Sequence, residues 1–193
     1  MADIDPDGPG DLTLEPVVVY CDMKSRNGTG VTVIGHDQEE RKQVQGWEGA
    51  REYQANLAYN ISFDHVVSII DQSEYCEQYI KWECLAALIH NFNDNNKITT
   101  GWLNRTRGVA DYFGGASPGS NGCACGVNHS CANPLFLCNC DSNDNVWRKD
   151  DGYLNYKDDL PVYAFVAGDT GGSDEKGYSM IGPLQCWGAS SQA

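Results

Sequence analysis

Five of the nine cysteines in this 193-residue chain lie within eighteen residues, at positions 123, 125, 131, 138 and 140. Thiols at this density either form disulfides or bind a metal. The chain is acidic, lacks an apolar run long enough to span a membrane and contains four Asn-x-Ser/Thr triplets. These features are typical of extracellular proteins. Thiols oxidise to disulfides in the extracellular environment. We therefore expect a disulfide-closed loop between Gly122 and Gly152. The alternative is a zinc site that uses His129.

The charge balance limits the classes of partner. Asp and Glu number 27 against 13 Lys and Arg, which gives a formal net charge of -14. This charge disfavours nucleic acid and anionic membranes, because phosphate groups would be repelled. Acidic surfaces suit calcium, basic protein partners or solubility. We expect neither nucleic-acid binding nor direct membrane insertion.

Residues for catalysis are poorly represented. The chain has no GxSxG motif, and its four histidines have no patterned Ser, Cys or acidic partner. Adjacent acids, such as Asp150 with Asp151 and Asp158 with Asp159, are usually solvated rather than catalytic. The sequence therefore predicts a protein that is not an enzyme.

Two oxygen-rich segments could bind calcium. The first alternates carboxylates near the N-terminus, at Asp3, Asp5, Asp7 and Asp11. A glycine allows a sharp bend there, but the twelfth position is Leu14 rather than the Glu of an EF-hand, so a solvated acidic turn is the alternative. The second segment carries Asp141, Asn143 and Asn145, with Val146 where a glycine would be expected.

The Asn-x-Ser/Thr triplets predict surface sites for N-linked glycans. Their acceptor residues are Asn27, Asn60, Asn104 and Asn128.

Hydrophobic periodicity predicts the elements that position these residues. Residues 17–21 form a β-branched run that indicates a buried strand. A tight turn follows, and residues 30–35 are expected to form a second strand. Residues 36–52 are polar and indicate a surface loop. Ser62 can cap a short helix whose apolar residues recur at helical spacing.

Period-two alternation over residues 73–89 predicts a long strand. Cys76 and Cys84 fall on one face of it, about 26 Å apart at roughly 3.3 Å per residue. Because a disulfide spans at most about 7 Å between Cα atoms, each must pair with a distant cysteine. Further strands are expected at 98–104, 108–115, 160–167 and 177–187.

Longer motifs carry a family resemblance. IDPDG followed by VVVYCDM resembles the start of fibrinogen-like C-terminal domains. The set SEYCEQYIKWEC, ADYFGGASPGSNGCACG, NHSCANP, LCNCDSN, VWRKDDGYLNYKDDLPV, AGDT and IGPLQC is similar to the fibrinogen-like segment of contactin-associated proteins and their neurexin-IV-type relatives. A fainter similarity to fibrillar-collagen C-propeptides involves IDPDG, YCDM, LPVYAFVAGDTGGSDEKG and IGPLQC.

The resemblance implies an α+β fold with a twisted central antiparallel sheet, short helices and long disulfide-stapled loops. It implies that residues 1–193 form a single fibrinogen-like domain, an N-terminally truncated fragment of a larger modular extracellular protein. The collagen relatives bind calcium at the loop that retains Asp5 and Asp7. The calcium loop of fibrinogen domains is matched only in part around Asp141.

The resemblance also bears on the cysteines. The family partner of Cys21 lies upstream of the IDPDG motif and has no counterpart here, which leaves Cys21 as the odd thiol. The collagen-type pairing joins Cys76 to Cys186. Six cysteines remain, and antiparallel alignment of the two C-x-C motifs would pair Cys123 with Cys140 and Cys125 with Cys138. Cys131 would then bond Cys84, and the closed loop would display Asn128 and Asp141 at its rim as a platform for a partner.

The function expected from this resemblance is a non-enzymatic, extracellular module, secreted or part of a membrane-protein ectodomain, for cell adhesion or matrix scaffolding. Its partners would be extracellular proteins or glycans. Two alternatives remain open at this point: a calcium-dependent, lectin-like domain and a homo-oligomerising module of the collagen-propeptide type.

Overall fold

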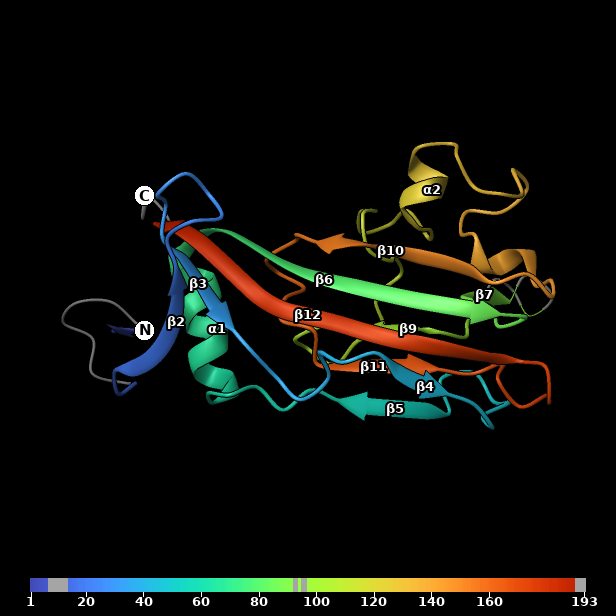
Figure 1. Ribbon diagram of the computed structural model, residues 1–193, viewed down its shortest axis with the longest axis horizontal. Coiled ribbons are helices and arrows are strands. Elements are labelled where there is room, and N and C mark those ends of the chain that lie inside the picture. Colours follow the sequence, from blue (N-terminus) through green and yellow to red (C-terminus); the bar gives the residue numbers. More distant parts are fainter. Residues whose placement is uncertain (7–13, 92–93, 95–96, 190–193) are drawn as a thin grey trace.

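The computed structural model describes residues 1–6, 14–91, 94 and 97–189. The expected α+β class is confirmed, because a central antiparallel sheet carries two short α-helices and four disulfides (Figure 1). The main sheet has the strand order β1-β2-β3-β12-β6-β10, with β4 also paired to β12. Its strands are β1 (Ala2–Ile4), β2 (Val17–Asp22), β3 (Val31–Ile34), β4 (Lys42–Val44), β6 (Ser73–Leu85), β10 (Arg148–Leu154) and β12 (Lys176–Ala189).

The two long strands, β6 and β12, form the spine of the molecule. They run antiparallel from the pair Ser73–Ala189 to the pair Leu85–Lys176, with one register shift between Ile181 and Leu184. The alternation predicted for β6 is confirmed, since every second residue from Cys76 to Cys84 is buried. Each of these strands therefore has a buried face and a face that points away from the core.

The buried face, called the inner face here, is covered by a helix and a second sheet. Helix α1 (Phe63–Gln72) starts at the predicted cap, where the Ser62 hydroxyl accepts from the backbone N–H of His65, and it buries Val66, Ile69 and Ile70. The small sheet has the order β5-β11-β9, and its Phe165 packs against Trp82 of β6 with ring centroids 5.5 Å apart. These strands are β5 (Tyr53–Asn56), β9 (Gly101–Leu103) and β11 (Ala164–Ala167).

Three segments differ in detail from expectation. The polar stretch 36–52 contains β4, which pairs with β12 and buries Val44 alone of its three residues. The strand expected at 108–115 reduces to one bridge, between Val109 and Leu103. Residues around the Asn-rich turn form the two-residue strands β7 (His90–Asn91) and β8 (Lys97–Ile98).

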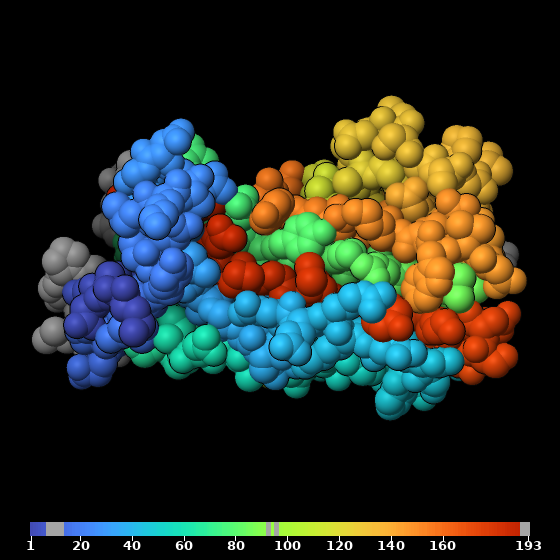
Figure 2. All heavy atoms as spheres, viewed as in Figure 1, coloured from blue at the N-terminus to red at the C-terminus, as the bar shows by residue number. Residues whose placement is uncertain are grey.

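Among the described residues, none forms a second layer over the centre of the opposite face of the main sheet, called the outer face here. Figure 1 shows α1 and β11 below β12 in the view, and neither element crosses in front of β6 or β12. Figure 2 shows the green surface of β6 and the red surface of β12 in a hollow between a blue lobe of N-terminal residues and a yellow and orange lobe of cysteine-rich residues. A single sheet thus buries one face in the core and presents the other to solvent.

Candidate functional site

The eight cysteines expected in disulfides are all bonded, but three of the four pairs differ from expectation. The observed pairs are Cys76–Cys186, Cys84–Cys140, Cys123–Cys138 and Cys125–Cys131. The first was expected, and the two residues lie directly opposite each other on β6 and β12. The expected pairs that are wrong are Cys84–Cys131, Cys123–Cys140 and Cys125–Cys138.

Local backbone explains the difference. The expectation treated 123–125 as extended, but Cys123 is the N-cap of the short helix α2 (Ala124–Val127). Because residues two apart on a helical turn do not face the same way, Cys125 closes a small loop to Cys131 while Cys123 turns toward Cys138. Cys140 begins the 3-10 helix η1 (Cys140–Ser142) and bonds Cys84 at the end of β6 instead.

Cys21 is the free thiol, as expected from the resemblance. Its side chain is half-buried on β2, and its Sγ lies 3.6 Å from Sδ of Met23.

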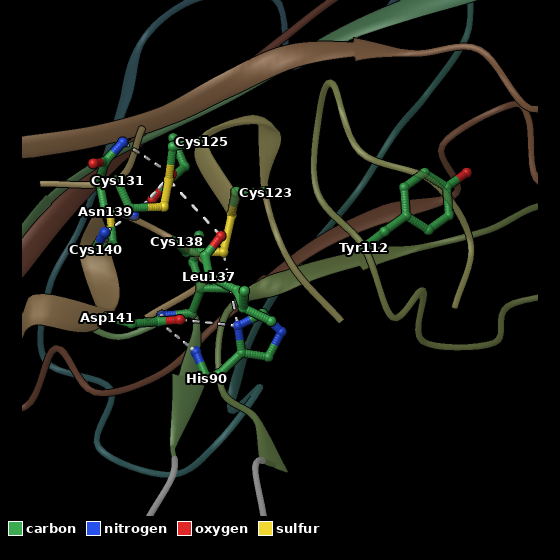
Figure 3. Close-up of a disulfide and its surroundings, with 12 residues drawn as sticks. His90, Tyr112, Cys123, Cys125, Cys131, Leu137, Cys138, Asn139, Cys140 and Asp141 are labelled. Atoms are coloured by element: carbon green, nitrogen blue, oxygen red, sulfur yellow. Dashed lines mark hydrogen bonds and ion pairs between the residues drawn. A yellow bond between two sulfur atoms is a disulfide. The ribbon is translucent and has the colours of Figure 1, made fainter. Parts of the chain in front are cut away.

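Asp141 anchors the cysteine-rich segment to β7. One carboxylate oxygen accepts from the backbone N–H groups of Ile89 and His90 at 3.0 and 2.8 Å, and the other lies 3.1 Å from Nδ1 of His90 (Figure 3). Asp141 is only 2% exposed, so the expectation that it lies at the rim of a platform is wrong. Asn143 and Asn145, its expected calcium partners, are exposed.

Asp150 anchors the same segment to β10. Its carboxylate accepts from the backbone N–H groups of Asn139 and Cys140 at 3.0 and 2.9 Å, and from the Asn139 side-chain amide at 3.3 Å. Burial raises the pKa of Asp150 to about 6, and the hydrogen bonds from Asn139 and Cys140 only partly oppose this shift. A buried carboxylate therefore connects the loop to the sheet.

These buried groups bring metal-type donors close together. His90, Cys138 and Asp141 form one group, and Cys123, Cys138 and Asp150 form another, each with donor atoms within 4.8 Å of one another. Both cysteine sulfurs are oxidised in one disulfide, so neither can supply a thiolate. His129, the ligand of the zinc alternative, is exposed. The arrangement is that of a structural staple.

The N-terminal acidic segment is described only in part. Asp3 lies on β1 and is exposed, as is Asp5. Asp7 and Asp11 lie outside the described residues, so calcium binding at this loop stays a prediction.

The four expected glycan acceptors differ in their surroundings. Asn27, Asn60 and Asn128 are exposed. Asn104 is half-buried and held at both ends of its amide: Nδ2 donates to Oδ1 of Asp159 at 3.0 Å, and Oδ1 accepts from the backbone N–H of Gly108 at 3.0 Å.

We therefore expect N-glycans at Asn27, Asn60 and Asn128 of the protein secreted from animal cells, and an unmodified Asn104. A glycan on Asn104 would break hydrogen bonds that hold the 104–108 turn, each worth about 1 kcal/mol. Enzymatic deglycosylation in heavy-oxygen water, followed by peptide mass spectrometry, reads each site. Full occupancy of Asn104 would contradict this assignment.

The outer face carries an unusual set of side chains. Cross-strand register places the outward residues of β10, β6 and β12 in rows, such as Tyr153–Tyr79 and Lys149–Glu83–Tyr178. The outer face comprises Tyr75, Glu77, Tyr79, Lys81 and Glu83 of β6, Tyr178, Met180 and Trp187 of β12, Lys149, Asp151 and Tyr153 of β10, and the adjoining Arg26, Arg41 and Trp147.

Its aromatic rings are ordered by contacts with one another and with arginines. At one end Tyr75 stacks on Trp187 with centroids 5.7 Å apart, and the Arg26 guanidinium lies 3.4 Å above the Trp187 ring. At the other end, Trp147 packs against Tyr178 at 5.7 Å, and a second arginine, Arg41, lies 3.3 Å above Tyr178. Between them, Tyr79 and Tyr153 meet edge to face at 5.4 Å.

The charges on the outer face are paired. Arg26 contacts Glu77 at 2.7 Å, Arg41 contacts Glu83 at 2.6 Å, and Lys149 contacts Asp151 at 3.2 Å. Lys81 is also paired with Glu83. Partial burial opposes ionisation of Glu83, but hydrogen bonds from Arg41 and Lys81 outweigh it and hold the pKa of Glu83 below its ordinary value. Four cations thus meet three carboxylates on one surface of a chain whose net charge is -14.

These features match the cores of protein interfaces, which are rich in Tyr, Trp, Arg and Met. Tyr75 is 52% exposed and Tyr153 is 46% exposed, although they lie on strands whose other face is in the core. This surface was not predicted from the sequence, because the alternation in β6 was interpreted only for the residues that it buries. The sequence feature that indicates this surface is the set of outward-facing residues of β6, which are aromatic and charged rather than small and polar.

The comparisons agree with the resemblance stated above. The chain is 37% identical over 186 residues to contactin-associated protein 1 of Homo sapiens, Mus musculus and Rattus norvegicus. The matched region spans 96% of this chain but 13% of each relative. No protein-family model matches the chain. Within the described residues, no helix has the length and apolar character needed to cross a membrane.

Proposed function

Because the chain is related over nearly its whole length to one segment of the contactin-associated proteins, we propose that it is a non-enzymatic extracellular module that acts in cell adhesion or matrix assembly through protein contacts. Four disulfides support an extracellular, oxidising location.

The outer face is the observation that carries this proposal. A sheet face without a second layer leaves aromatic surface in water, and burying it against a partner is favourable by roughly 25 cal/mol per Å² of apolar area. The stacked Tyr75 and Trp187 and the paired Arg26 are held before a partner arrives, so binding would cost them little side-chain entropy. The near balance of charge on this face means that an acidic partner meets no excess of negative charge where it makes contact.

Contactin is the first partner to test, because the name of the relatives records an association with it. Calcium binding at the loop containing Asp3 and Asp5 remains a prediction that is separate from this surface. The described contacts favour neither the calcium-dependent lectin nor the oligomerisation alternative over adhesion through the outer face.

We expect Trp187→Ala and Tyr75→Ala each to weaken binding to a purified contactin ectodomain by ten- to a hundredfold, since buried aromatic anchors contribute about 2 kcal/mol or more to interfaces. Surface plasmon resonance with the immobilised domain measures the dissociation constants. Leu135→Ala is the matched control, because Leu135 is 84% exposed but lies on the cysteine-rich loop.

Wild-type affinity in both aromatic variants, or loss of binding only in the Leu135 variant, would contradict the proposal and would favour the cysteine-rich loop as the binding surface. Unchanged melting temperatures of all three variants would show that the differences arise in binding and not in folding.

A further inference from the structure

A pocket of about 450 Å³ opens at one end of the outer face, where Arg41, which directly precedes β4, lies near the paired strands β6 and β10. It is lined by Arg41, Glu83, Trp147, Arg148 and Lys149. Its volume lies in the lower part of the range for small-molecule sites, which is roughly 300–1,000 Å³. Three of its five lining residues are cationic, although the chain has only 13 Lys and Arg among 193 residues.

The two arginines are oriented by internal carboxylates and retain donors for a ligand. Arg41 uses Nε and one terminal nitrogen on Glu83. Arg148 uses Nε and one terminal nitrogen on Asp144, at 2.9 and 2.6 Å. Arg41 also has a side-chain hydrogen bond with Tyr178. Across the described part of the chain, the other terminal nitrogen of Arg148 makes no hydrogen bond. Fixed guanidinium groups with a free N–H edge are suited to recognition of a carboxylate.

The charge of the cluster favours a single anionic group. Arg41, Arg148, Lys149 and the neighbouring Lys81 contact Glu83, Asp144 and Asp151, so four cations balance three carboxylates. The excess of one positive charge can be neutralised by one carboxylate. A densely sulfated polymer would bring several negative charges against the three carboxylates and would be repelled by them.

The aromatic wall supplies the other half of the site. Trp147 is 48% exposed, in contrast to the fully buried Trp82 and Trp102. Tyr178 packs against its ring, and Arg41 covers Tyr178 in turn. The exposed indole is therefore fixed beside the guanidinium groups, where it offers a flat apolar surface.

We propose that this pocket binds the carboxylate-bearing terminal sugar of a glycan, of the sialic acid class. The carboxylate contacts the free guanidinium edge of Arg148, with the positive charge of Arg41 beside it, and the C–H surface of the sugar ring packs on Trp147. Glu83 accepts from a sugar hydroxyl. An acidic peptide side chain supplies the carboxylate but not the broad apolar ring, so it leaves the indole exposed.

The test uses the whole protein, 3′-sialyllactose as the probe and lactose as its neutral counterpart, monitored through the indole N–H signals in nitrogen-15 NMR. We expect saturable shifts with sialyllactose at a dissociation constant on the order of 1 mM, which corresponds to about 4 kcal/mol, and no saturation with lactose. Arg148→Gln and Trp147→Ala should each weaken binding at least tenfold.

The control is the equivalent pair at the opposite end of the outer face, where Arg26→Gln and Trp187→Ala should leave sialyllactose binding unchanged. Because those positions carry the proposed contactin contact, failure of one proposal leaves the other intact. Equal binding of lactose, no saturation below 20 times the expected constant (about 20 mM), or tighter binding of a heparin oligosaccharide would overturn the assignment. The half-buried Arg148 side chain contacts only Asp144 of the same loop within the described residues, so Arg148→Gln provides a folded variant even if Trp147→Ala is unstable.

Discussion

Removal of the Cys76–Cys186 disulfide, by the double substitution Cys76→Ala with Cys186→Ala, is expected to lower the free energy of unfolding by about 4–5 kcal/mol. The bond joins residues 110 positions apart and therefore removes the most chain entropy from the unfolded state. It also joins the two strands that form the spine of the sheet. Urea unfolding of the non-reduced protein, followed by circular dichroism, measures the change.

The matched control is the double substitution Cys125→Ala with Cys131→Ala, which opens a loop of only six residues. The same entropy argument predicts a loss of about 2 kcal/mol for this pair. Equal losses, or a larger loss for the small loop, would show that native contacts rather than loop length determine what these bonds contribute.

Asp150 is expected to make stability depend on pH in the direction opposite to that of a salt-bridged carboxylate. Burial raises the pKa of Asp150 in the folded state to about 6, above its value in the unfolded chain. The contribution of Asp150 to the free energy of unfolding is therefore fully present below about pH 4 and is lost as the pH rises through 6. The stability of the wild type relative to Asp150→Asn should fall by on the order of 3 kcal/mol between pH 4 and pH 7.

Urea titrations of both proteins at several pH values give this difference directly, and groups that titrate identically in the two proteins cancel. A difference that stays constant, or that grows in favour of the wild type as the pH rises, would contradict the assignment of a raised pKa to Asp150.

Long periodic segments of this fold were predictable from sequence, and short ones were not. The alternation in β6 and the capped helix α1 are confirmed, because their hydrophobic patterns span many residues. Strand β4 was missed because its three residues are mostly polar and depend on pairing with β12. The apolar pattern of segment 108–115 indicates a strand, but its Tyr112 and Phe113 are buried in a loop, and the indole of Trp102 on β9 donates to the Tyr112 carbonyl.

Disulfide pairing could be predicted only where a regular element set it. Cys76 and Cys186 lie on regular strands, and the pairing implied by the resemblance agrees with the register. The remaining pairs depend on the helical turn that follows Cys123. The predicted pairing assumed instead that the C-x-C segment is extended. The buried positions of Asp141 and Asp150 were likewise hidden, because they follow from packing against β7 and β10.

The outer face could be predicted in part. The outward half of β6 was visible in the sequence, but its proximity to Trp187, Arg26 and Trp147 depends on strands far apart along the chain. The sequence also contained no sign that the described residues leave this face without a second layer, since that follows from the packing of α1 and β11 on the buried side of the sheet.

The most direct measurement of the central claim places a glycan on the outer face. Tyr79→Asn with Lys81→Thr creates an Asn-x-Thr triplet at the centre of β6, and Gln54→Asn with Asn56→Thr creates one on β5 at the other side of the molecule. With both glycans confirmed by mass spectrometry, we expect the β6 glycan to abolish binding of the contactin ectodomain and the β5 glycan to leave it unchanged. Wild-type binding by the protein with the β6 glycan would contradict the outer face as the adhesion surface.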